Sequence, residues 1–240
     1  MKMCGSFFVY INHRFIFKNV DLRYSIQGQQ NRAKEREDKD MSRLVGPTIE
    51  VESAHGVREV SLDTRHLMNR RIFIHGEIDD DSANDFLSQM LYLEQESDEP
   101  ITIYINSPGG QVDAGLLIYD CIQSCDVEVN IVCAGMAASM AAILLASGKK
   151  GHRYILPHSK VMIHEPLISQ GVGGSATSIK NISDTILAMR ELVNNILAKH
   201  TGKTLEEVNK ATAFDNYMNA EAAIEFGICD QVAEKVKLAF

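Results

Sequence analysis

The sequence predicts an α/β protein built from repeated βαβ units. Three apolar runs of strand character, at residues 70–78, 101–107 and 127–135, alternate with segments whose apolar residues recur at helical spacing. Short connections separate these elements. Strands and helices that alternate through short connections are typical of parallel βαβ units, so we expect a mainly parallel sheet covered by helices.

The first 40 residues differ in composition from the rest of the chain. Residues 31–40, NRAKEREDKD, are nearly all charged and cannot contribute to a core. The apolar patch near the start is interrupted by polar residues at 12–14, which makes it a poor secretory signal. We therefore expect residues 1–40 to be an N-terminal extension or propeptide, and residues 41–240 to form one domain.

The first predicted helix follows the first strand. Its start at residue 79 offers acidic and Ser/Asn capping residues, and Phe86, Met90 and Leu93 then fall at helical spacing. The next strand leads through an expected turn at SPGGQ into a helix over residues 112–125.

One hydroxyl stands in an almost wholly apolar run, AGMAASMAAILLASG, at residues 134–148. We expect the preceding strand to end at Gly135 and Ser139 to lie in the first turn of the next helix. Short strands at 152–157 and 160–164 follow, and the second of them ends at His164.

A long amphipathic helix is predicted over residues 177–200. Its apolar residues alternate at spacings of three and four, and they are Ile179, Ile182, Ile186, Met189, Val193 and Ile196. A helix of this length needs a partner surface, which an oligomer would supply. After it, Thr204 and Glu207 form the capping-box start of a further helix, another helix ends at Gly227, and residues 228–233 form a final strand.

The composition excludes several classes of function. The 32 acidic residues outnumber the 24 basic ones, which gives a formal charge of −8, and no basic stripe with interleaved aromatics occurs, so we expect no nucleic-acid partner. No run approaches the ~18 apolar residues that cross a bilayer, so we expect no membrane partner. The five cysteines lie mostly in apolar stretches, which favours reduced core thiols, a cytoplasmic location and no bound metal.

Ser139 and His164 are the candidates for nucleophilic chemistry. The carboxyl ends of parallel strands meet at one edge of a sheet, and Ser139, His164 and the pair Gly109 and Gly110 all follow predicted strands. Each also has a simpler explanation: a buried serine bonded to a backbone carbonyl, an edge histidine, and glycines that only turn the chain. The chain contains neither G-x-S-x-G nor H-E-x-x-H, and it lacks the phosphate-binding loop G-x-x-x-x-G-K-[ST].

Three motifs, YINSPGGQVDAGLLIYD, GMAASMAAILLASG and HSKVMIHEPL, in this order and spacing closely resemble the proteolytic subunit of the Clp proteases, which has a crotonase-like fold. The likeness runs from about residue 60 to about residue 232. It implies a Ser-His-Asp triad and an oxyanion hole built from two backbone N–H groups. The matching residues are Ser139 as the nucleophile, His164 as the base, Asp215 as the acid, and Gly110 and Met140 as the oxyanion donors.

The resemblance further implies an architecture and an assembly. A long protruding handle helix within residues 165–200 would interlock two stacked heptameric rings, and residues 48–58 would form a flexible axial segment. An ATP-driven Clp unfoldase would feed unfolded polypeptide into the rings, so this chain would need no cofactor of its own. The other acids in this part of the chain, Asp184 and Asp230, are expected to be solvated.

Three residues depart from those usual in the family: Met136, Ala141 and Glu165. Because side chains alternate along an extended strand, we expect Glu165 to point away from the triad. Two alternatives to a self-sufficient serine endopeptidase stay open. The departures near Ser139 would suit a regulatory ring subunit that is weakly active without a paralogue. A crotonase-type acyl-CoA enzyme would share the fold but would leave Ser139 and His164 without a role.

Overall fold

The computed structural model describes residues 47–53, 56–168, 171 and 173–236. The chain divides into two compact units, Met1–Ser61 and Leu62–Phe240. The extension expected at residues 1–40 lies outside the described residues. The single domain that we expected over residues 41–240 stays a prediction.

In the first unit, β1 (Thr48–Ser53) and β2 (Gly56–Ser61) form an antiparallel hairpin. The Thr48 hydroxyl donates a hydrogen bond to the Glu59 carboxylate of the facing strand. Isoleucine and valine alternate with acidic residues in β1, a pattern that favours strands. The described part of residues 48–58 therefore has regular strand structure, whereas we expected a flexible segment, and its role in an assembly stays a prediction.

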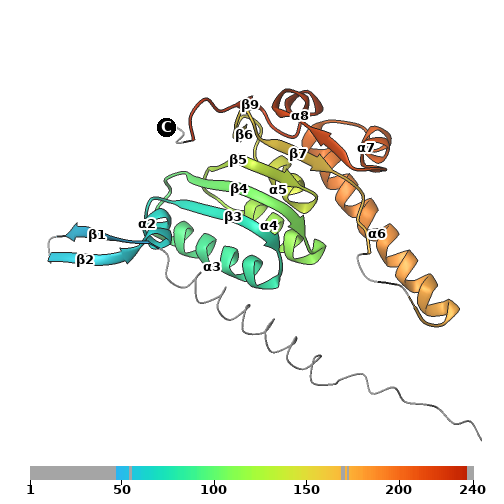
Figure 1. Cartoon of the computed structure of the whole chain (residues 1–240), viewed down its shortest axis with the longest axis horizontal. Helices are drawn as coiled ribbons and strands as arrows, with labels where there is room; N and C mark the ends of the chain where they lie inside the picture. Colours follow the sequence, from blue (N-terminus) through green and yellow to red (C-terminus); the bar gives the residue numbers. More distant parts are fainter. Residues whose placement is uncertain (1–46, 54–55, 169–170, 172, 237–240) are drawn as a thin grey trace, which may run out of the picture. The chain divides into compact units, whose positions relative to one another are not determined.

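The second unit is built on a seven-stranded sheet (Figure 1). Five strands lie in the order β3 (Arg71–Ile78), β4 (Ile101–Gly110), β5 (Val129–Ala138), β6 (Arg153–Ile155) and β9 (Gln231–Val232), and each neighbouring pair among them is parallel. β7 (Lys160–Ile163) pairs in parallel with the last residues of β5 and antiparallel with β8 (Asn216–Met218). The mainly parallel sheet confirms the predicted α/β class.

Three helices lie along one face of this sheet: α3 (Asp80–Glu96), α4 (Val112–Ser124) and α5 (Met140–Ala146) (Figure 1). The apolar residues predicted for the first of them, Phe86, Met90 and Leu93, are all buried. The Met140 side chain packs against Gly115 of α4, where a β-carbon would lie 2.5 Å from the methionine Cε. Gly115 therefore lets α4 approach the start of α5 closely.

α6 (Ala176–Thr201) has 26 residues and is about 39 Å long at 1.5 Å per residue. Its C-terminal part packs on the core through Val193, Ile196 and Leu197, which are buried. Its N-terminal part extends away from the sheet, and Ile179 is 46% exposed there (Figure 1). The protruding helix confirms the predicted handle shape, and the surface expected to cover it stays a prediction. Neither α6 nor any other helix in the described ranges is long and apolar enough to cross a membrane.

Of the remaining helices, α7 (Leu205–Thr212) and α8 (Ala220–Phe226) match predicted helices, whereas α2 (Leu62–Met68) does not. α7 starts with the predicted capping box of Thr204 and Glu207, and α8 ends at Gly227, which has a φ of +96°. α2 was not predicted, and it buries none of its side chains. Its side chains, such as Leu67, are only partly buried against the core, so this helix lacks the apolar periodicity on which such a prediction depends.

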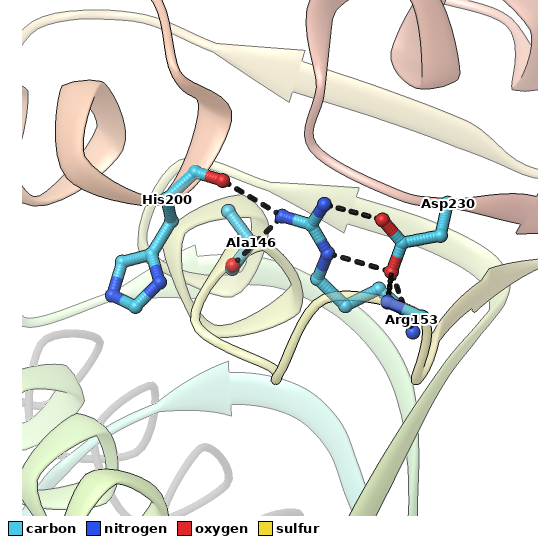
Figure 2. Close-up of polar contacts among 5 residues, drawn as sticks. Ala146, Arg153, His200 and Asp230 are labelled. Atoms are coloured by element: carbon cyan, nitrogen blue, oxygen red, sulfur yellow. Dashed lines mark hydrogen bonds and ion pairs between the residues drawn. The ribbon is translucent and has the colours of Figure 1, made fainter.

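A buried ion pair between Arg153 and Asp230 joins β6 to the segment before β9 (Figure 2). Arg153 Nε donates to Asp230 Oδ2 at 2.9 Å, while Arg153 Nη1 donates to the carbonyls of Ala146 and His200 at 3.2 and 3.0 Å. Those carbonyls belong to the last turns of α5 and α6, where carbonyls have no partner within the helix. Arg153 thus holds the C-terminal end of α5, and Ser139 lies at the other end of that helix.

Candidate active site

Ser139 lies at the junction between β5 and α5, as the N-cap residue of α5. It therefore precedes the helix, whereas we expected it in the first helical turn. Its φ and ψ are 55° and −125°, a conformation that residues other than glycine rarely adopt. Its N–H donates to the Met162 carbonyl at 2.8 Å, and its carbonyl accepts from the Ala142 N–H at 3.0 Å. These bonds hold the strained turn and so fix the direction in which the Ser139 side chain leaves the backbone.

β5 reaches Ser139 because its backbone bends around the Asn106 side chain. The register between β4 and β5 shifts at a bulge beside Asn106. The Met136 N–H donates to Asn106 Oδ1 at 3.2 Å, and the Gly135 N–H donates to Ser159 Oγ at 2.8 Å. Side chains thus satisfy the freed backbone groups, and the strand continues along β7 to Ala138 instead of ending at Gly135 as predicted.

β4 also runs further than predicted, through the SPGG segment that we expected to be a turn. The last two residues of β3 lie opposite Gly109 and Gly110, so both glycines belong to the sheet. Gly109 has a φ of +91°, and a β-carbon on it would lie 2.7 Å from the Cβ of Ser139 and 3.0 Å from the Met140 nitrogen. Only glycine satisfies both the conformation and the close approach.

His164 directly follows β7 and lies between Ser139 and Asp215. Its Nε2 is 3.0 Å from the Ser139 Oγ, and its Nδ1 is 3.2 Å from the Asp215 Oδ1. The His164 side chain is 15% exposed and the Asp215 side chain is 60% exposed. The imidazole is thus enclosed, whereas the carboxylate that contacts it stays open to solvent. The structure brings together all three residues that the resemblance assigns to a triad.

Backbone contacts hold His164 from both sides. Ile163 pairs with Asn216 in the ladder of β7 and β8, and the Glu165 N–H donates to the Thr212 carbonyl at 2.7 Å. Asn216 directly follows Asp215, so the same ladder fixes the residue beside the carboxylate. Imidazole and carboxylate therefore come from two segments that are paired with each other.

The elements around Ser139 also place the N–H groups of Met140 and Gly110. Met140 is the first residue of α5, and the first N–H groups of a helix have no acceptor within it. Gly110 lies opposite Ile78, and the next N–H group, that of Gln111, donates to the Ile78 carbonyl at 2.8 Å. In a parallel ladder this leaves the Gly110 N–H on the other edge of β4, toward the strand that leads to Ser139.

The other two acids of this part of the chain are held elsewhere. Asp184 is exposed as expected, and its carboxylate accepts from Lys180 Nζ at 2.8 Å. The expectation of a solvated Asp230 is wrong, because its side chain is only 14% exposed and pairs with Arg153. Burial alone would raise the pKa of Asp230, but the hydrogen bonds and positive charge of Arg153 outweigh it and lower that pKa.

The four cysteines in the described ranges, Cys121, Cys125, Cys133 and Cys229, are free thiols, as expected. Burial raises the pKa of Cys133 and of Cys229 to about 12, so these thiols do not compete with Ser139 as nucleophiles near neutral pH. Across the part of the chain that the structure describes, no three His, Cys, Asp or Glu side chains are grouped as metal ligands would be.

The sequence interpretation missed the polar side chains that support the site. Ser107 is fully buried, and its Oγ donates to the Gly76 carbonyl at 2.6 Å and accepts from the Gly109 N–H at 3.0 Å. Asn106 and Ser159 hold the bulge of β5. The available signal was a polar pair, Asn106 and Ser107, at the end of the apolar run ITIYI.

The strand ends of this α/β sheet bring together a strained serine, a histidine and an aspartate, and hydrogen bonds link the three in that order. This is the arrangement of a nucleophilic hydrolase site. The sequence model of the Clp protease family matches residues 54–236 of this chain, a range that includes Ser139, His164 and Asp215. The chain therefore belongs to the Clp protease family and is a Clp-type peptidase. The match favours peptide-bond hydrolysis over the acyl-CoA alternative.

Proposed function

We propose that this protein is a serine endopeptidase, the proteolytic core subunit of an ATP-dependent Clp protease. The observation that carries the proposal is the hydrogen-bonded chain from Ser139 through His164 to Asp215. The Ser139 Oγ is 3.0 Å from His164 Nε2, and His164 Nδ1 is 3.2 Å from the Asp215 Oδ1. These distances suit proton transfer from a serine hydroxyl to an imidazole that a carboxylate orients.

In the proposed mechanism, Ser139 Oγ attacks the peptide carbonyl while His164 Nε2 takes the hydroxyl proton. The tetrahedral intermediate then collapses, the C–N bond breaks, and His164 gives that proton to the leaving amine. Water attacks the resulting acyl-enzyme and passes a proton to His164, which returns it to Ser139 as the second product leaves. Asp215 holds the Nδ1–H of His164 and stabilises the imidazolium in both halves of the reaction.

The N–H groups of Gly110 and Met140 would bind the oxyanion of the tetrahedral intermediate. Each such donor lowers the barrier by about 3–4 kcal/mol when it is aimed at the developing charge. Ala138 and Met140 are each 2% exposed, so the backbone on either side of the partly exposed Ser139 is shielded from water. Electrostatic interactions are stronger where water is excluded, which supports an oxyanion site at this position.

The family match and the protruding α6 support a ring assembly. We propose two stacked heptameric rings, in which α6 contacts the opposite ring and residues 48–58 form the axial segment. An ATP-driven Clp unfoldase would deliver unfolded polypeptide in the cytoplasm, whereas short peptides would enter unaided. The chain has no phosphate-binding loop, so the nucleotide would act through the unfoldase, and the proposed chemistry uses no metal or cofactor.

A fluorophosphonate probe tests the proposed nucleophile. We expect the purified protein to be labelled at Ser139, as mapped by mass spectrometry, and labelling to be lost in Ser139→Ala and strongly reduced in His164→Ala. His158→Ala is the matched control, because His158 is an exposed histidine just before β7, and it should be labelled like the unmodified protein. Hydrolysis of a short fluorogenic peptide should follow the labelling across these variants.

Labelling of a different serine would overturn the assignment of Ser139. The sample must be folded and must have the mass of the proposed assembled rings. If such a sample is not labelled at all, the hypothesis that this protein is an active peptidase without a paralogue is excluded. The alternative is then a regulatory ring subunit, for which labelling of Ser139 should appear only after a paralogous subunit is added.

A further inference from the structure

Glu165 and Arg190 form an ion pair that joins the residue after His164 to α6. Arg190 Nη1 donates to Glu165 Oε2 at 3.2 Å, and each side chain is 44% exposed. The carboxylate thus reaches α6, in line with the expected alternation of side chains along the chain. A half-exposed ion pair contributes little to the stability of the fold. Any role of this pair therefore follows from its position next to His164 and not from its contribution to the stability of the fold.

α6 reaches the same segment through a second residue one helical turn later. Asn194 is 1% exposed, and its Nδ2 donates to Thr212 Oγ1 at 3.2 Å and to Asn209 Oδ1 at 2.7 Å. The Thr212 carbonyl accepts the Glu165 N–H at 2.7 Å. Residues four apart lie on one face of a helix, so Arg190 and Asn194 act from the same side of α6. Together they hold Glu165 by its carboxylate and, through Thr212, by its backbone.

The two sides of His164 differ in how they are held. On one side, Ile163 lies in the ladder of β7 and β8. On the other, Glu165 has the backbone bond to Thr212 and the ion pair to Arg190. Among the residues that the structure describes, loss of the ion pair would leave the bond to Thr212 as the one hydrogen bond of Glu165, and the imidazole of His164 would gain freedom to move relative to Ser139.

We propose that Glu165 and Arg190 are positioning residues, which hold the His164 imidazole against Ser139 by attaching residue 165 to α6. The inference rests on the proposed function, since it needs His164 to act as the base. A displaced base slows proton transfer without weakening substrate binding, so the effect belongs in kcat and not in KM.

Four variants and one control test this role. Glu165→Ala and Arg190→Met each remove the ion pair, and the methionine keeps the apolar stem of the arginine. The double variant tests whether the two losses share one cause. Glu165→Gln is the conservative variant, because its amide oxygen still accepts a hydrogen bond from Arg190. The control, Lys180→Ala, breaks the exposed pair of Lys180 and Asp184 on the same helix.

The measurements are kcat and KM for a short fluorogenic peptide, the rate of fluorophosphonate labelling at Ser139, the melting temperature and the sedimenting mass. We expect Glu165→Ala and Arg190→Met to lower kcat and the labelling rate about tenfold, with KM changed by less than about twofold. The double variant should be no slower than the slower single variant. Glu165→Gln should keep most of the kcat, and Lys180→Ala should match the unmodified protein.

Unchanged kcat and labelling in Glu165→Ala and Arg190→Met would overturn the proposal, provided that the unmodified protein is labelled at Ser139. A rise in KM at constant kcat would overturn it as well, because it would indicate a substrate contact. Loss of ring-sized mass in both single variants would show a structural role and would also overturn it. If the unmodified protein is not labelled, the proposed function itself fails, and the two failures are distinguished.

Discussion

Gly109 lies so close to Ser139 that a β-carbon on Gly109 would be 2.7 Å from the Cβ of Ser139 and 2.6 Å from the Ala138 carbonyl oxygen. Gly109 belongs to β4, and Ser139 directly follows β5, the parallel neighbour of β4 in the sheet. The glycine therefore allows the strand that carries the proposed oxyanion donor Gly110 to approach the end of the strand that leads to the nucleophile.

Gly109→Ala should damage both catalysis and stability. The new β-carbon would clash with backbone atoms, and the φ of +91° is unfavourable for alanine. We expect kcat/KM for a fluorogenic peptide to fall about 100-fold and the free energy of unfolding to fall by about 2–4 kcal/mol. Gly173→Ala is the control, because a β-carbon there meets nothing within 4 Å. Full activity of Gly109→Ala would show that the two strands separate at little cost.

Asp215→Asn should lower kcat more than it changes KM. The amide no longer stabilises the imidazolium of His164 and favours the wrong ring tautomer. Because the Asp215 side chain is 60% exposed, water replaces part of its effect, and we expect a loss of about 10²-fold, smaller than the loss of about 10⁴-fold that follows the same change at a buried triad aspartate. Asp184→Asn, at an exposed ion pair on α6, should keep normal kcat. An equal loss in both variants would remove Asp215 from the proposed triad.

The sequence was sufficient for the elements with a buried face or a capping signal. Phe86, Met90 and Leu93 mark α3 because a helix that packs on a sheet must bury one side, and Thr204 and Glu207 mark the start of α7 because their side chains bond the exposed N–H groups. Apolar periodicity and capping are local in the chain. They can therefore be recognised without knowing the fold.

The ends of β4 and β5 could not be predicted in the same way. Gly135 and the SPGG segment have turn-forming residues, and local sequence favours a break at both. The strands continue because Asn106 and Ser159 supply hydrogen bonds to β5 from distant parts of the chain, and Ser107 bonds the distant Gly76 as well as the nearby Gly109. Likewise, the positions of Ser139 and His164 in the sequence were also compatible with a buried structural serine and an edge histidine. The contact of His164 with Asp215 depends on the pairing of β7 with β8, which the local sequence does not reveal.

Asp230→Ala should destabilise the protein strongly. It leaves the guanidinium of Arg153, which is 3% exposed, without its charge partner in the core. Breaking such a pair costs about 3–5 kcal/mol, whereas replacing both partners with apolar residues costs less. We expect the urea midpoint to fall in Asp230→Ala and to recover in part when Arg153→Met and Asp230→Leu are combined. A midpoint equal to that of the unmodified protein would mean that water reaches Arg153.

The same ion pair should weaken in acid. Burial alone would raise the pKa of Asp230, but Arg153 lowers that pKa below its ordinary value of 3.8 in the folded protein. As the pH falls, Asp230 therefore takes up its proton in the unfolded chain before it does so in the folded protein. The contribution of the ion pair to the free energy of unfolding is complete above about pH 3.8 and is lost as the pH falls through the pKa of Asp230 in the folded protein. The difference in urea midpoint between the unmodified protein and Asp230→Ala should narrow below that pH. A constant difference would contradict the assignment of the lowered pKa to the pair.

His200 should make the fold sensitive to mild acid. Its Nε2 lies 3.0 Å from the Tyr119 hydroxyl, which accepts a hydrogen bond from Lys199 Nζ at 3.3 Å and keeps its own proton free to donate to a neutral imidazole. Burial, together with the positive charges of Lys199 and Arg153, lowers the pKa of His200 from 6.5 to about 4. Between these two pH values His200 is protonated in the unfolded state but not in the folded state. The contribution of neutral His200 to the free energy of unfolding is therefore complete above about pH 6.5 and falls as the pH approaches 4.

We expect His200→Gln to lose less stability than the unmodified protein between pH 7 and pH 5, when the urea midpoints of both are compared. The difference should be on the order of 1–2 kcal/mol, less than the full shift implies because the ring is partly exposed and solvent screens the neighbouring charges. The amide of glutamine still accepts the Tyr119 hydroxyl, so the change at pH 7 should be small. His158→Gln, at an exposed histidine, should follow the unmodified protein at both pH values. Equal losses in His200→Gln and the unmodified protein would assign the acid sensitivity to other groups.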